Sequence, residues 1–279
     1  MRTSSTELTL SALQGSSLLG FLASLGAFRT LAMLPEAGDV RMRWIAGGGS
    51  YCPVLRLPSP ADHEVVVEKL HAALRGLAGH YVITLEKDLK IPRGVFRKLA
   101  AKAADDFLTH TDPSAASMVA AFGCDAVGNE DGTIEDTAFR TMSGADRNSS
   151  PTMRWAAEVD RRYALRWDEP SKDPVRTVRG ANLLAIAALP FYPVVPTSST
   201  TVATTGFAGR GSRDTFVTWP IWTGWLALDA ARSLFGLKEL QGRSETSIKF
   251  LEMLGVAATY RSQRITLGKY RNFTPAAAM

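Results

Sequence analysis

An apolar stretch near the start of the chain, "SSLLGFLASLGAFRTLAML" (Ser16–Leu34), constrains the fold more than any other feature. Its large apolar side chains recur at helical spacing, at Leu18, Phe21, Leu22, Leu25 and Phe28. This spacing predicts a helix that faces a core around most of its circumference. Ser16 or Ser17 can cap its first turn, and Pro35 stops it. Arg29 and several small or polar residues interrupt the stretch, so we predict a buried helix and no membrane partner.

Short strands and helices surround this predicted helix. Residues 39–44 ("DVRMRW") alternate, with Arg41 and Arg43 on one face and apolar side chains on the other. Residues 61–79 read as a helix with Asp62 as its cap. Further on, two strands are predicted around the loop "AGRGSR", followed by an amphipathic helix. The pattern predicts an α+β fold, with mixed, largely antiparallel sheets flanked by helices.

The acidic, glycine-containing segment 128–136 is the best candidate boundary between domains. It divides the chain into an N-terminal α+β domain, residues 1–127, and a basic C-terminal α+β domain, residues 137–279, which can still pack as one globule. Residues 1–139 hold 13 Lys+Arg and 16 Asp+Glu, a net charge of −3. Residues 140–279 hold 19 and 11, a net charge of +8, so the two halves sum to the total of +5. This one-sided basic charge indicates either a polyanionic partner or a solvated basic surface.

The chain contains two cysteines, Cys52 and Cys124, far apart in the sequence. They form no disulfide or metal-binding pattern, and they are typical of a protein from a reducing compartment. The first ten residues lack the basic-then-apolar order of a secretory signal. We therefore expect a cytoplasmic protein.

Three segments of the C-terminal half combine arginines with strand or turn patterns. In "DRRYALRW" (residues 160–167), Arg162 and Arg166 share one face of a predicted strand. "GFAGRGSR" (residues 206–213) is a glycine-rich hairpin loop, and "YRSQRITLGKYRNFTP" (residues 260–275) interleaves basic and aromatic residues. Such groups pair with phosphates and stack on bases, although polar strand faces, a plain hairpin tip or a protein partner's carboxylates also explain them. The candidate nucleic-acid-binding residues are Arg161, Arg162, Arg166, Arg176, Arg179, Arg210, Arg213, Arg261, Arg264, Lys269 and Arg271.

Three tryptophans, Trp219, Trp222 and Trp225, recur every third residue in "TWPIWTGWL". Tryptophan is enriched at interface hot spots, so these residues are the candidate contacts of a protein-interaction subunit. Packing in the core is the alternative, and the pattern favours it.

The segment "DDFLTHTD" brings Asp105, Asp106, His110 and Asp112 together, and a metal-dependent nuclease can use such a cluster. An exposed acidic helix end explains it better, because a two-metal site needs further carboxylates from elsewhere. The glycine-rich loop lacks the residues of a phosphate-binding P-loop. We therefore expect a protein that is not an enzyme and uses no cofactor.

Longer segments of the chain resemble a protein family found with type I-G (formerly I-U) CRISPR–Cas systems. They include "SALQGSSLLGFLASLGAFRTLA", "SPTMRWAAEVDRRYALRWDEPSKDPVRTVRGANLLAIAALPFYPVVP", "TTGF", "FVTWPIWTGWLALDAARSLFGL" and "YRSQRITLGKYRNFTP". The family is associated with the helicase–nuclease extension and with large-subunit-like components of the interference complex. The link between "SGADRNS" and "PTMRW" is shorter than expected, so contacts made by a longer insert are not assumed. The resemblance implies a non-catalytic subunit whose partners are other effector subunits and double-stranded DNA or guide RNA, with sequence read mainly by guide pairing.

Overall fold

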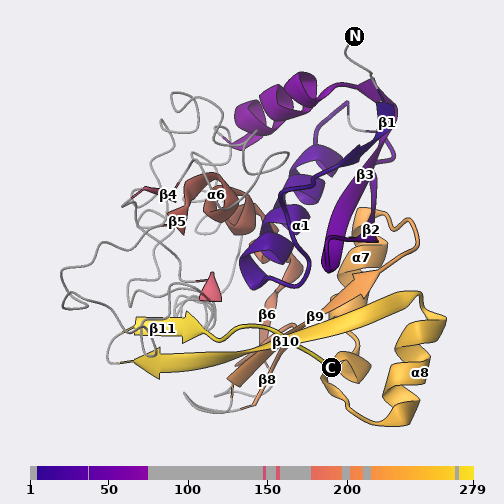
Figure 1. Ribbon diagram of the computed structural model, residues 1–279. Helices are drawn as coiled ribbons and strands as arrows, with labels where there is room; N and C mark the ends of the chain where they lie inside the picture. The colour runs from indigo at the N-terminus through magenta and orange to yellow at the C-terminus, as the bar shows by residue number, and fades with distance from the viewer. Residues whose placement is uncertain are drawn as a thin grey trace.

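The apolar stretch forms helix α1 (Leu18–Ala32), which crosses the middle of the molecule (Figure 1). The computed structural model describes residues 5–36, 38–74, 147–148, 155–157, 177–196, 202–209, 215–267 and 270–279. Every residue of α1 except Arg29 and Ala32 is buried, as the helical spacing predicted. The Ser17 hydroxyl caps the helix by accepting a hydrogen bond from the Gly20 amide at 3.4 Å. No helix in the described part of the chain is both long enough and apolar enough to cross a membrane.

The N-terminal sheet packs one face against α1 and exposes the other. Its strands are β1 (Ser5–Thr9), β2 (Arg41–Gly47) and β3 (Ser50–Ala61), in the antiparallel order β1-β3-β2. Met42 and Trp44 are buried, whereas Arg41 and Arg43 are not, which confirms the predicted alternation. Residues 63–74 are helical, and the Asp62 carboxylate accepts the Val65 amide at 3.0 Å, as expected of its cap.

The C-terminal sheet is built around two long antiparallel strands that pass beneath α1 in Figure 1. Its strand order is β11-β10-β9-β8, and β12 also pairs with β10. The strands are β8 (Phe207–Ala208), β9 (Thr215–Trp222), β10 (Val256–Leu267), β11 (Tyr270–Phe273) and β12 (Ala277–Ala278). The two-residue strand β8 pairs with β9 across the loop "AGRGSR", as predicted, but most of the segment before the loop forms β7, which pairs with β6.

Helices cover the core and connect the sheets. The remaining elements are β4 (Arg147–Asn148), β5 (Thr177–Val178), α6 (Arg179–Ala188), the 3₁₀ turn η3 (Leu189–Phe191), β6 (Val194–Pro196), β7 (Val202–Thr204), α7 (Leu228–Phe235), the 3₁₀ turn η4 (Lys238–Gln241) and α8 (Glu245–Met253).

Helix α6 crosses α1 closely at Gly26, where an added Cβ atom would lie 1.7 Å from the Leu184 carbonyl oxygen. A side chain of any size at Gly26 is therefore incompatible with this crossing.

The described parts of the two predicted domains share one hydrophobic core. Phe21 of α1 lies with its ring centroid 5.5 Å from that of Trp44, 5.8 Å from Trp219 and 5.9 Å from Phe235. A backbone bridge joins Met42 of β2 to Leu226 of the C-terminal half. The predicted boundary segment, residues 128–136, lies outside the described residues. The architecture is α+β, with helices packed on antiparallel sheets, as predicted.

Candidate nucleic-acid interface

Most of the predicted nucleic-acid-binding residues fall outside the part of the chain that the structure describes. These are Arg161, Arg162, Arg166, Arg176, Arg210, Arg213 and Lys269, and the carboxylates and histidine of residues 105–112 lie outside it too. Arg179 is the first residue of α6, and Arg271 pairs with Thr266 in the C-terminal sheet. The structure describes the side chains of Arg261 and Arg264, both on β10.

Arg264 is a core residue, with 4% of its surface exposed. Its Nη2 atom donates to the Thr215 hydroxyl at 3.4 Å, inside the sheet. Residues three apart on a strand point to opposite faces, so Arg261 and Arg264 cannot both face a common partner. The expectation that Arg264 contacts nucleic acid does not fit this placement, because its guanidinium is covered by the protein.

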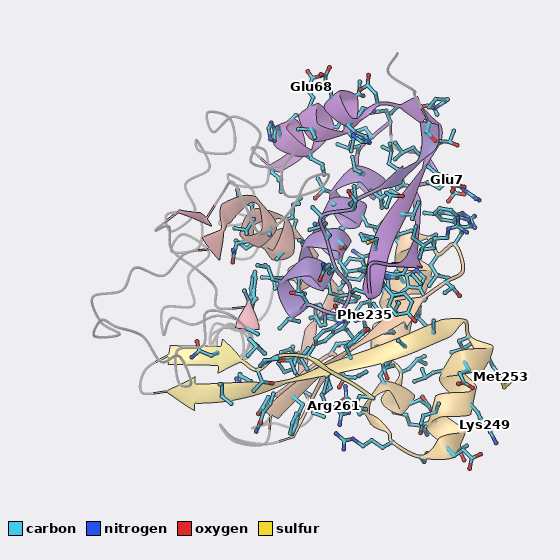
Figure 2. The ribbon with its side chains drawn as sticks, viewed as in Figure 1. Glu7, Glu68, Phe235, Lys249, Met253 and Arg261 are labelled. Atoms are coloured by element: carbon cyan, nitrogen blue, oxygen red, sulfur yellow. The ribbon has the colours of Figure 1, made fainter. Side chains whose placement is uncertain are left out.

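Arg261 lies on the outer face of the C-terminal sheet, away from α1. Figure 2 shows it on the opposite side of β10 from the core residue Phe235. Its Nε atom donates to the Thr218 hydroxyl at 2.9 Å, and its Nη2 atom donates to the backbone and side-chain oxygens of Gln241 at 3.1 and 3.3 Å. Gln241 is fixed in turn, since its amide nitrogen donates to the Gly206 carbonyl at 3.0 Å. These hydrogen bonds hold the guanidinium plane in one orientation.

In the part of the chain that the structure describes, no carboxylate neutralises the charge of Arg261. Desolvation by burial lowers its pKa, and the nearby positive charge of Arg243 lowers the pKa further. Within the described residues, neither Arg243 nor Arg261 has a carboxylate at ion-pair distance. Lys238 and Glu239 of η4 offset each other in charge, and Glu245 pairs with Lys249 at 2.6 Å. Two like charges held close together without a counter-ion are stabilised by an anion such as a phosphate.

The tryptophans of "TWPIWTGWL" divide between the core and the surface. Trp219 and Trp222 are fully buried, and their indole nitrogens donate to the Gly15 carbonyl at 2.8 Å and the Met42 carbonyl at 2.9 Å. Neither offers a surface to a protein partner. Both are buried because β9 is covered on its two faces at this end, which the three-residue spacing does not reveal.

Trp225 belongs to a second charged cluster, on the solvent side of the N-terminal sheet. The guanidinium carbons of Arg43 and Arg56 lie 4.4 and 4.0 Å from its ring centroid. Glu7, labelled at the sheet edge in Figure 2, pairs with Arg56 at 2.8 Å and with Arg43 at 3.4 Å. Sequence reasoning missed this cluster, because its members come from β1, β2, β3 and a distant loop. The outward alternation of the arginines on β2 was the one available signal.

In comparisons with known proteins, no protein-family model matches the sequence, and no curated protein matches it. In the described residues, no group of three or more His, Cys, Asp or Glu side chains is placed to hold a metal ion.

Proposed function

We propose that the chain is a non-catalytic component of a type I CRISPR–Cas interference system and that it binds the backbone of a nucleic acid. The observation that carries the proposal is the pair Arg243 and Arg261. Arg261 lies on the outer face of the sheet and donates to the Gln241 carbonyl, and Arg243 follows two residues later in the exposed turn before α8. Neither arginine has a carboxylate partner in the described residues. The net charge of +8 over residues 140–279 supports it. The resemblance to the CRISPR-associated family supplies the biological context.

A role in backbone binding has a defined physical signature. Each phosphate neutralised by Lys or Arg releases condensed counter-ions, so affinity falls steeply with salt. Sequence selection in guide-directed complexes comes from base pairing, so a subunit of this kind needs charge and shape more than base-specific contacts. An arginine pair that reads a phosphate backbone meets this requirement.

The test is the affinity of the purified chain for a labelled DNA duplex, measured by fluorescence anisotropy across a salt series. We expect the logarithm of affinity to fall linearly with the logarithm of salt concentration, and we expect Arg243→Gln to reduce the slope by about one. Arg41→Gln is the matched control, because it removes an arginine that pairs with Asp39 on the other sheet. A flat, weak response to salt would contradict the proposal.

A second candidate function is protein interaction, in which the chain recruits an effector subunit or the helicase–nuclease. Helix α8 favours it, because its end exposes Phe250 (41%), Met253 (84%) and Leu254 (44%). Figure 2 shows Met253 and Lys249 at the outer edge of the molecule. Loss of co-purification with the effector complex in Met253→Ser, with binding retained in Arg243→Gln, would favour this role over nucleic-acid binding.

A further inference from the structure

We propose that the outer face of the C-terminal sheet is a stacking platform for single-stranded nucleic acid, formed by Phe216, Arg261 and Arg243. The inference rests on the proposed function and specifies the kind of nucleic acid that this face accepts. It follows from three observations: an aromatic ring kept partly at the surface, a guanidinium held in plane by hydrogen bonds, and a second, exposed arginine that has no carboxylate partner among the described residues.

Phe216 is the exception on its strand. The other seven residues of β9 are buried, whereas Phe216 is half-exposed. Directly paired residues share a face of a sheet, and Phe216 pairs with Ala208 on one side and with Gln263 on the other. Its cross-strand neighbours are therefore a small side chain and an uncharged polar one. Phe216 therefore keeps part of its ring accessible at the surface.

The guanidinium of Arg261 lies over the Phe216 ring and adds a second planar group to this surface. Its guanidinium carbon lies 5.7 Å from the Phe216 ring centroid, and hydrogen bonds to Thr218 and Gln241 fix its plane. Unpaired bases stack on aromatic rings and on the planes of arginine guanidiniums. Arg261 is thus already ordered before a base arrives, so little side-chain entropy is lost on binding.

Arg243 provides a phosphate contact at the edge of the platform. It is exposed, it precedes α8, and it follows two residues after Gln241, whose carbonyl accepts a hydrogen bond from Arg261 at 3.1 Å. A strand that places a base on Phe216 carries its phosphates within reach of such cations. A duplex keeps its bases stacked inside the helix, so it can use the arginines and not the aromatic ring. The geometry therefore predicts a preference for single strands.

The experiment compares a labelled oligothymidylate with a duplex of equal length, by fluorescence anisotropy at one salt concentration. We expect tighter binding of the single strand. Phe216→Leu keeps an apolar side chain and removes the aromatic ring, so we expect about a tenfold weaker affinity for the single strand and less than about a twofold change for the duplex. Arg243→Gln should weaken both, because it removes a phosphate contact.

Circular dichroism checks that each variant folds. If Phe216→Leu does not fold, Phe216→Trp replaces it. Stacking of a base on the added indole should quench its fluorescence, so we expect oligothymidylate to lower the tryptophan fluorescence of Phe216→Trp more than that of the wild type. Salt-dependent duplex binding with no preference for the single strand, and no effect of Phe216→Leu, would overturn this inference and leave the proposed function intact. Absence of binding to either nucleic acid would overturn both. Unchanged fluorescence of Phe216→Trp on binding would also contradict the platform.

Discussion

Replacing Gly26 with alanine tests the close crossing of α1 and α6, where an added Cβ atom meets backbone. The added Cβ atom would lie 1.7 Å from the carbonyl oxygen of Leu184 and 2.5 Å from its carbonyl carbon. Both are backbone atoms, so no side chain can rotate to make room. The helices would have to move apart by more than about 1 Å within a close-packed core.

The magnitude follows from two opposing terms. Alanine is better than glycine inside a helix by about 1 kcal/mol. Overpacking a core costs about 1–3 kcal/mol, and a clash with backbone belongs at the upper end of this range. We expect Gly26→Ala to lower the free energy of unfolding by about 2 kcal/mol, which corresponds to a Tm about 4–8 °C lower for a chain of this size.

Thermal unfolding followed by circular dichroism measures this change, with chemical denaturation as a second measure. Gly47→Ala is the matched control, because nothing lies within 4 Å of an added Cβ atom there. A Gly26→Ala protein as stable as the wild type, or more stable, would show that α1 and α6 do not cross as described.

Three other substitutions test particular contacts. Trp219→Phe removes the donor to the buried Gly15 carbonyl, so we expect the free energy of unfolding, measured by chemical denaturation, to fall by about 2 kcal/mol. An unchanged denaturation midpoint would refute the assigned hydrogen bond. Trp225→Ala removes the contacts with Arg43 and Arg56, so we expect the free energy of unfolding to fall by about 1–2 kcal/mol. A fall of less than about 0.5 kcal/mol, as for a typical surface substitution, would count against the cluster. Burial raises the pKa of Tyr192 above its usual range, so the folded state holds this proton at a pH where the unfolded chain releases it. Stability should therefore fall as pH rises above about 10, and less steeply in Tyr192→Phe; identical alkaline unfolding curves would contradict this.

Local features of the fold were predictable because they depend on residues close together in the sequence. The helical spacing in residues 16–34 led to a buried α1, and Ser17 and Asp62 cap helices as expected. Alternation placed Arg41 and Arg43 on the outer face of β2. Helix α8 was not predicted, because its apolar residues do not form one continuous stripe and few of them are buried.

The sequence by itself determined the central apolar helix, the α+β class and the excess of basic charge in the second half of the chain. The tertiary structure decided which of the basic and aromatic residues are available to a partner. The three-residue spacing of Arg261 and Arg264 places them on opposite faces of a strand, but only packing decides which face is covered: Arg261 is partly exposed and Arg264 is buried. Trp219 and Trp225 also differ only through tertiary packing. The ring of Trp219 is buried against Phe21 of α1, whereas the ring of Trp225 lies under Arg43 and Arg56 of the N-terminal sheet. Pairing register and burial depend on contacts between residues distant along the chain, and residue spacing alone does not encode them.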